Sequence, residues 1–85
     1  MKKVRITLNR DEGLHARAAS LFVKKASRYL SDIKIVKENN EYEAKSILGI
    51  MSLGAIQGDQ ITLVASGEDE EDAIYELSSF LQKNV

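Results

Sequence analysis

The single histidine of this chain stands where a helix is predicted to begin, next to residue types that can bind an anion. Residues 13–20 read G-L-H-A-R-A-A-S, so His15 lies two positions before Arg17. The first backbone N–H groups of a helix have no partner within that helix, and together with the helix dipole they bind anions. We therefore predict that the N–H groups of Ala16, Arg17 and Ala18, the last two in particular, form an anion site beside His15.

The same helix end would also set the chemistry of the histidine ring. The positive end of the dipole disfavours the imidazolium cation, so the ring of His15 is expected to be neutral and nucleophilic near neutral pH. A neutral ring can attack phosphorus, and the guanidinium of Arg17 adds a fixed charge with bidentate geometry. A lone histidine can also be a surface or packing residue, and the helix start between Gly13 and Ala16 favours the chemical role.

A second candidate site is Ser46, which precedes the apolar run I-L-G-I-M-S-L-G. Serine before such a run is a preferred helix N-cap, and Gly49 at the third helical position leaves no capping box. Because a phosphate at a helix N-terminus is favoured by the dipole, Ser46 can be both a structural cap and a phosphorylation site.

The apolar residues of this short helix cannot all face the core. We expect Ile50 and one neighbour to be buried, and Leu48 or Met51 to remain outside as an adaptable contact surface. The alternative is a loosely covered core residue. Gly54 suits a C-terminal cap.

Hydrophobic periods predict four short strands and three amphipathic helices. A period of two marks strands near residues 4–8, 33–35, 42–44 and 61–65, and helical spacing marks residues 16–30, 47–53 and 73–81. Residues 38–41 read as a turn because asparagine tolerates positive φ. The order β-α-β-β-α-β-α predicts an α+β fold, an open-faced β-sandwich in which three helices cover one face of a four-stranded antiparallel sheet.

Composition restricts the class of protein. The chain has 85 residues, which suit one domain spanning 1–85. It has no cysteine and one histidine, which excludes disulfides and thiolate sites and argues against zinc. The net charge of −1 argues against direct nucleic-acid binding, and no apolar run reaches the length of a membrane span. We expect a cytoplasmic protein without cofactor, metal or membrane insertion.

Charge is unevenly distributed along the chain. Residues 13–31 carry four cationic side chains and no acidic one, whereas every residue of 68–72 is acidic. A basic face that comprises Arg17, Ser20, Lys24 and Lys25 is predicted on the first helix. Such charges are usually a solvated face, but the absence of any acid favours an acidic partner, whose approach the face would steer. The acidic run is explained by its place in the first turn of a helix, with Lys83 in the last turn. The glycines of 49–54 have phosphate-loop spacing, but the Lys-Ser/Thr of such a loop is missing.

Two stretches of the chain resemble one known family. G-L-H-A-R at 13–17 is similar to the active-site segment of the histidine-containing phosphocarrier family (HPr) of the bacterial sugar phosphotransferase system. K-S-I-L-G-I-M-S-L-G at 45–54 resembles the regulatory-serine segment of that family in low-GC Gram-positive bacteria. The separation of the segments, the length and the element order fit along essentially the whole chain. The resemblance implies a stoichiometric carrier rather than an enzyme, with Mg²⁺ and acid–base chemistry supplied by its partners.

The resemblance also implies roles for individual residues. His15 would accept a phosphoryl group, through Nδ1, from phosphorylated enzyme I, whose donor is phosphoenolpyruvate, and would pass it to the IIA domains of sugar permeases. Arg17 would stabilise the phosphate. Ser46 would be the substrate of an ATP-dependent serine kinase/phosphorylase, and the product would act with a catabolite control repressor. Partners would dock on Ser20, Lys24, Ile47, Leu48 and Met51.

Ala18 departs from the family pattern, which typically has proline three residues after the histidine. Proline in a first helical turn pre-sets φ and lacks an N–H that would be unpaired anyway. Alanine is a good helix former, so the helix should persist. Two alternatives remain. A regulatory-only paralogue would use Ser46 alone, and the known one has glutamine at the position of His15. A small-molecule-binding regulatory domain of ferredoxin-like type would share the element order without requiring either segment.

Overall fold

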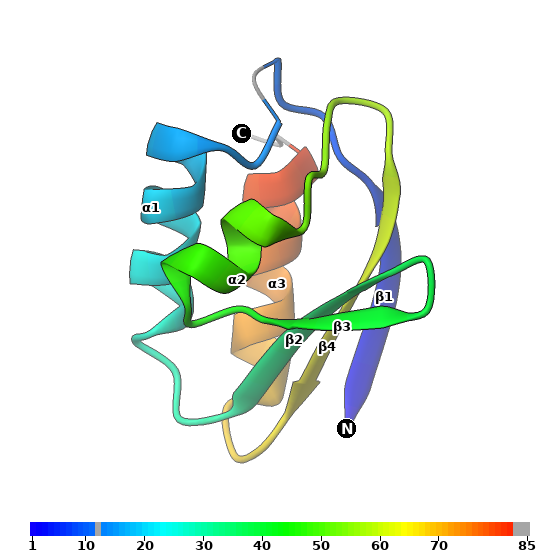
Figure 1. The fold of residues 1–85 in the computed structure, drawn as a ribbon. Coiled ribbons are helices and arrows are strands. Elements are labelled where there is room, and N and C mark those ends of the chain that lie inside the picture. Colours follow the sequence, from blue (N-terminus) through cyan, green and yellow to red (C-terminus); the bar gives the residue numbers. More distant parts are fainter. Residues whose placement is uncertain (12, 83–85) are drawn as a thin grey trace.

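The computed structural model describes residues 1–11 and 13–82, and it contains the predicted elements in the predicted order (Figure 1). Strands β1, β2 and β4 coincide with stretches of alternating hydrophobicity, and the helices coincide with stretches of helical spacing. The elements are β1 (Lys2–Thr7), α1 (Ala16–Ala26), β2 (Asp32–Lys37), β3 (Asn40–Glu43), α2 (Ile47–Ser52), β4 (Gln60–Ser66) and α3 (Glu70–Gln82).

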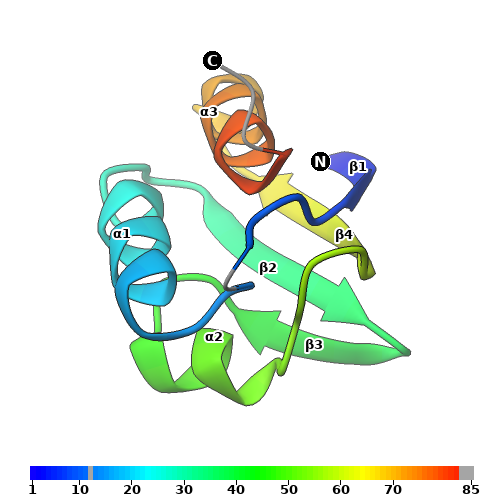
Figure 2. The same ribbon diagram turned by 90° about the horizontal axis from the view of Figure 1, so that it is seen from above.

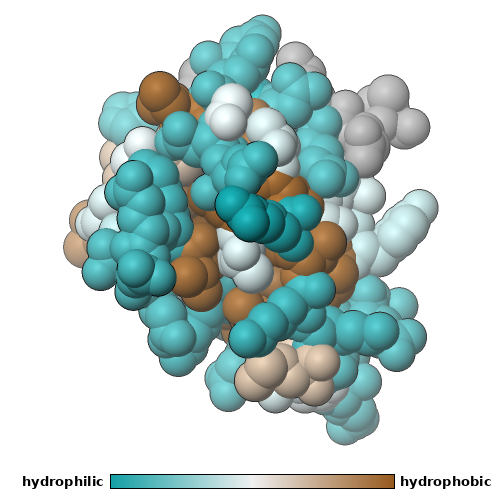
Figure 3. All heavy atoms as spheres, turned by 90° about the vertical axis from the view of Figure 1, so that its right-hand side faces the viewer, coloured by the Kyte–Doolittle hydropathy of each residue, from teal (hydrophilic) through white to brown (hydrophobic). Residues whose placement is uncertain are grey.

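The strands form one antiparallel sheet in the order β1-β4-β2-β3, and the helices lie on one side of it (Figures 1 and 2). Side chains therefore alternate between a covered and an open face. In β4, Ile61, Leu63 and Ala65 are buried, whereas Thr62 and Val64 are only half-buried. The space-filling view in Figure 3 shows hydrophobic patches near the middle of this face, with hydrophilic side chains around and between them. The predicted open-faced α+β arrangement is confirmed.

The core lies between the sheet and the helices. Helix α1 contributes most to it, with Ala18, Ala19, Phe22, Val23 and Ala26 buried. Helix α3 adds Ala73, Leu77 and Leu81, and α2 adds only Ile50. The helix that carries the candidate histidine is thus anchored along its whole length.

Helix α1 ends earlier than its apolar stripe predicts. The stripe continues to Leu30, but the helix ends at Ala26 and Leu30 is 79% exposed. The cause is tertiary, because the carboxylate of Asp69 accepts the N–H groups of Leu30 (2.9 Å) and Ser31 (3.0 Å) and the Ser31 hydroxyl (2.5 Å). These bonds hold the chain in a loop and keep the pKa of Asp69 below its usual value, the Ser31 hydroxyl contributing most.

The acidic run therefore does more than compensate the helix dipole. Glu70, Glu71 and Asp72 lie in the first turn of α3, as predicted. Glu70 also accepts the N–H of Gly67 at 2.9 Å and pairs with the N-terminal amine at 3.1 Å. The run joins three segments of the chain. Lys83, predicted at the other helix end, lies outside the described residues.

The β2–β3 hairpin turns through two residues at positive φ, Glu38 at 52° and Asn39 at 70°. Such a pair is typical of a type I′ turn, whose twist matches that of the strands. The asparagine was expected to adopt this conformation. The glutamate was not, and β3 consequently begins at Asn40, earlier than the predicted 42–44.

Candidate functional site

The segment before His15 is held against the loop between α2 and β4. Gly13 is buried with φ +66°, and a Cβ atom there would lie 2.4 Å from the carbonyl oxygen of Ala55 and 3.0 Å from Cα of Ile56. The N–H of Leu14 donates to the same Ala55 oxygen at 3.1 Å, and the Leu14 side chain is 1% exposed. Only glycine fits this close approach in a left-handed conformation. The chain thus reaches His15 from a fixed point.

His15 is exposed and is the N-cap of α1, with extended backbone (φ −133°, ψ 151°) and no capping bond from its side chain. Its ring is therefore free for chemistry. The next residue, Ala16, has φ +45°, which an alanine adopts at a cost of roughly 1–2 kcal/mol. Strained backbone of this kind gathers at functional sites, because the surrounding structure has to hold it.

The backbone donors around His15 differ from the prediction at one position. The Ala18 N–H donates to the carbonyl oxygen of His15 at 3.1 Å, so the expectation that it has no partner within the helix is wrong. The helix closes its first turn with this bond instead. The N–H groups of Ala16 and Arg17 have no hydrogen-bond partner among the described residues. These two N–H groups are available to an anion.

Arg17 is exposed and forms no ion pair with any described acidic residue. A guanidinium that is not neutralised keeps its full charge for a ligand. The structure therefore places three groups predicted from the sequence at the start of α1: the ring of His15, the N–H groups of Ala16 and Arg17, and the Arg17 side chain.

The basic face of α1 is narrower than predicted. Ser20 and Lys24 are exposed, as expected. Lys25 instead turns towards α3, where its Nζ lies 3.2 Å from Glu76 and 5.8 Å from the centre of the Phe80 ring. Placing Lys25 on the solvent face was wrong, because the α3 acid and ring attract it.

Helix α2 begins as its sequence predicts. Ser46 is the N-cap, and its hydroxyl oxygen accepts the N–H of Gly49 at 3.1 Å. Gly54, at φ +66°, follows the last turn, and its N–H donates to Met51. The confirmed cap leaves Ser46 at the positive end of a helix dipole, where a phosphate would be stabilised.

The apolar residues of α2 divide between core and surface. Ile50 is fully buried and Met51 packs partly against the core. Ile47 is 46% exposed and Leu48 is 78% exposed, so Leu48 is the exposed member that the sequence left undecided. Helices α1 and α2 pack side by side (Figure 2), and Leu21 of α1 is 43% exposed.

Sequence reasoning missed the loop on which the site rests. The carbonyl oxygen of Ala55 accepts the N–H of Leu14. Ile56, which is 64% exposed, has its Cα against Gly13. No local pattern marks these residues. The only signal was Gly13 itself, since a glycine just before a helix can indicate a close backbone approach.

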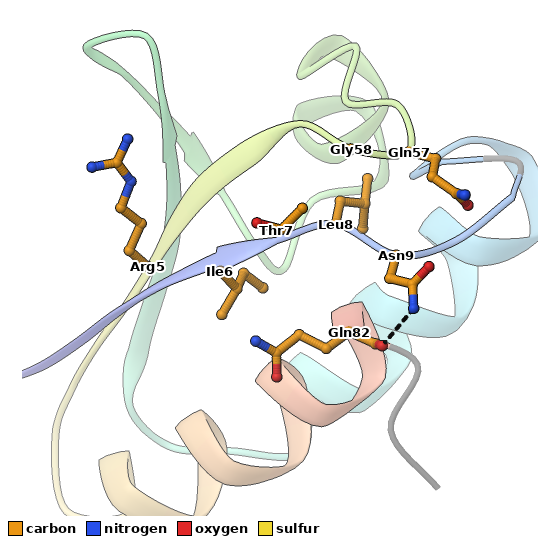
Figure 4. Close-up of a pocket in the computed structure, with 8 residues that line it drawn as sticks. All are labelled: Arg5, Ile6, Thr7, Leu8, Asn9, Gln57, Gly58 and Gln82. Carbon is orange, nitrogen blue, oxygen red and sulfur yellow. Dashed lines mark hydrogen bonds between the residues drawn. The ribbon is translucent and has the colours of Figure 1, made fainter.

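The candidate residues His15 and Arg17 are exposed at the molecular surface. A hollow of about 710 Å³ lies instead at the end of β1, beside the end of α3 (Figure 4). There the side-chain amide of Asn9 donates to the carbonyl oxygen of Gln82 at 3.3 Å, and Arg5 is the single charged residue among the described residues of the lining. None of the candidate residues lines this hollow.

Two further properties can be stated for the described part of the chain. None of its helices is long and apolar enough to cross a membrane. It also has no cluster of three or more histidine, cysteine or acidic side chains that would hold a metal ion.

The fold and site define a class of protein: a small α+β domain with one exposed histidine at a helix N-terminus. The chain belongs to the HPr family, because the model of the PTS HPr component phosphorylation site matches residues 2–83. Members of this family are phosphocarriers and not enzymes. The family resemblance of the sequence is therefore confirmed, and the ferredoxin-like alternative is removed.

Relatives named phosphocarrier protein HPr and relatives named HPr-like protein Crh are both similar to this chain over nearly its whole length. The HPr-like protein Crh of Bacillus subtilis is 40% identical over 100% of both chains. Phosphocarrier protein HPr of Mycoplasma pneumoniae is 39% identical over 99% of this chain and 97% of the relative. A crystal structure of HPr from Bacillus anthracis has a TM-score of 0.93 and 41% identity, covering 95% of this chain and 96% of the other.

Proposed function

We propose that this chain relays a phosphoryl group on His15 from phosphorylated enzyme I to the IIA domains of sugar permeases, in the cytoplasm and as one domain of residues 1–85. The observation that supports this most is the exposed His15 at the start of α1, next to the N–H groups of Ala16 and Arg17 and the Arg17 guanidinium, none of which is paired with a described residue. A nucleophile and the donors for its product stand within two residues of each other.

The transfer is a displacement at phosphorus. A ring nitrogen of His15 forms the new N–P bond while the bond between phosphorus and enzyme I breaks. In the second transfer the N–P bond to His15 breaks as phosphorus bonds to the IIA domain. The N–H groups of Ala16 and Arg17 and the Arg17 side chain receive the phosphate oxygens, whose charge the helix dipole also favours. Since the site is open, the partner has to exclude water from it. The Mg²⁺ belongs to the partner enzymes.

We assign the second site, Ser46, to regulation by a serine kinase/phosphorylase. A phosphate on Ser46 keeps acceptor oxygens near the Gly49 N–H, so the helix start can survive modification. It also adds negative charge beside the exposed Ile47 and Leu48. That charge alters a docking surface without unfolding it, and the modified protein acts with a catabolite control repressor.

The docking surface proposed for enzyme I and the IIA domains covers α1 and α2. Its exposed members are Ser20, Lys24, Ile47 and Leu48, with Met51 supporting them from a half-buried position. Exposed apolar side chains beside cations fit a partner with an apolar patch and an acidic rim.

The regulatory-only alternative has support from several comparisons, since two curated relatives are HPr-like protein Crh and a solved structure describes Crh as the catabolite repression HPr of Bacillus subtilis. A relay experiment separates the two functions. The protein is charged with enzyme I and labelled phosphoenolpyruvate, freed of donor and mixed with a IIA domain. We expect label to pass to the IIA domain. Label acquired only from ATP and a serine kinase, with none from enzyme I, would instead establish the regulatory-only role.

A further inference from the structure

One ion pair has the lowest side-chain exposure of those among the described residues, and it involves the loop between α2 and β4. Lys37, the last residue of β2, places its Nζ 3.4 Å from Oδ2 of Asp59, and the two side chains are 18% and 28% exposed. The same Nζ lies 3.5 Å from the carbonyl oxygen of Leu53 at the end of α2. The pair thus connects the hairpin with the loop between α2 and β4.

Asp59 also closes this loop on itself. Its Oδ2 accepts the N–H of Ile56 at 2.9 Å, and its own N–H donates to the Ile56 carbonyl at 3.0 Å. The bond from Ile56, followed by the charge of Lys37, outweighs burial and keeps the pKa of Asp59 below its usual value. The carboxylate is therefore charged when it holds the loop, and Lys37 compensates that charge.

The closed loop is the support of the segment that carries His15. Its Ala55 oxygen accepts the Leu14 N–H, and Gly13 lies directly against it. At its other end the loop exchanges two 2.8 Å bonds with Leu8, one to the Asp59 carbonyl oxygen and one from the Gly58 N–H. The chain before His15 is held at both of its ends by residues that Asp59 orders.

We propose that Lys37 and Asp59 are positioning residues for His15, acting through the turn 56–59 on Gly13 and Leu14. The proposal rests on the function proposed above. Neither residue touches the phosphate. Their effect is to fix the place from which α1 and its ring start, and small displacements of a reacting group slow group transfer strongly.

Two substitutions that change the net charge in opposite directions test this role. Asp59→Asn removes an anion, and Lys37→Met removes a cation while keeping a stem of similar length. Through long-range steering towards an acidic partner, the first would speed transfer and the second would slow it. Through positioning, both slow it. We expect each to reduce the rate of phosphoryl uptake from enzyme I by roughly 3- to 10-fold, and Lys37→Arg to restore it.

Lys34 offers a matched control on the same strand. It pairs with Glu41 at 3.6 Å on the exposed face, where the two side chains are 48% and 66% exposed. Lys34→Met therefore removes the same charge as Lys37→Met, but from a side chain that pairs with Glu41 and not with the loop between α2 and β4. All rates are measured at a temperature where urea titration shows every variant to be folded. If Asp59→Asn is too unstable, Lys37→Met still tests the proposal, because it keeps the bond from the Ile56 N–H to Asp59.

A second readout does not depend on phosphoryl transfer. Hydrogen exchange of the Leu14 amide, which is bonded to Ala55, should become faster in Asp59→Asn and Lys37→Met and stay unchanged in Lys34→Met. Rates for the two loop variants equal to that of Lys34→Met, with unchanged Leu14 exchange, would overturn the positioning role. A wild-type protein that takes no phosphate would refute the proposed function, and Leu14 exchange would still decide whether the pair orders the loop.

Discussion

Replacing Gly13 with alanine should damage both the fold and the site, and Gly54→Ala provides its matched control. Both glycines have φ +66°, so an alanine meets the same backbone strain at either position. The surroundings differ. A Cβ at Gly54 has no atom within 4 Å, whereas a Cβ at Gly13 meets the backbone oxygen of Ala55 at 2.4 Å. The difference between the two variants therefore isolates the close approach of the active-site segment to its supporting loop.

The magnitude follows from these contacts. The left-handed conformation costs an alanine roughly 1–2 kcal/mol, and loss of unfolded-state freedom returns about 0.4–1 kcal/mol. We expect Gly54→Ala to lower the free energy of unfolding by about 1 kcal/mol. In Gly13→Ala the Ala55 backbone has to move as well, and the buried Leu14 N–H loses its acceptor, which adds about 1–3 kcal/mol.

Urea unfolding of the two variants measures this difference. With a denaturant dependence of about 1 kcal/mol per molar for a chain of this size, the midpoint of Gly13→Ala should lie about 1–3 M below that of Gly54→Ala. Equal midpoints would refute the close approach of Gly13 to Ala55. Phosphoryl uptake from enzyme I should also fall in Gly13→Ala, compared under conditions where both variants are folded.

Four further variants have expected outcomes. Ser46→Ala should lower the free energy of unfolding by about 1 kcal/mol in urea because the Gly49 N–H loses its cap, whereas Ser46→Asp should keep the stability and slow phosphorylation by enzyme I. The pKa of Asp69 is lowered in the folded state, so its contribution to stability is present above the unfolded pKa of about 3.9 and is lost as the pH falls through the folded value. Asp69→Asn should therefore lower the urea midpoint at neutral pH and make the fall of the midpoint below about pH 4 less steep. A parallel fall in the variant and the wild-type protein would contradict this. Ala18→Pro removes an N–H that is already bonded to the His15 carbonyl, so the half-life of phosphorylated His15 should not change, and a shorter half-life would show that this N–H holds the phosphate.

Features that depend on neighbouring residues were accessible from the sequence. The periods of β4 and α3 follow from one covered sheet face. The cap at Ser46 follows from a serine before an apolar run, and the helix start at His15 follows from the change to helical spacing after Gly13. The two candidate sites are local in this sense, since His15 and Arg17 belong to one helix turn.

Features that depend on distant residues were not accessible. Helix α1 ends at Ala26 because Asp69, far along the chain, captures the loop after it. Lys25 leaves the solvent face because Glu76 attracts it. The support of His15 by the turn that Asp59 closes has no local pattern, since each partner is an ordinary loop or strand residue until the sheet brings them together.

The most direct test of the central claim is the intact mass of the chain after incubation with enzyme I and phosphoenolpyruvate. The wild-type protein should gain one phosphoryl group that is lost in acid, as expected for phosphohistidine. His15→Ala should gain none, and it should fold normally because the His15 side chain is exposed and makes no capping bond. Equal modification of His15→Ala, or an unmodified wild-type protein, would contradict the assignment of His15 as the phosphoryl carrier.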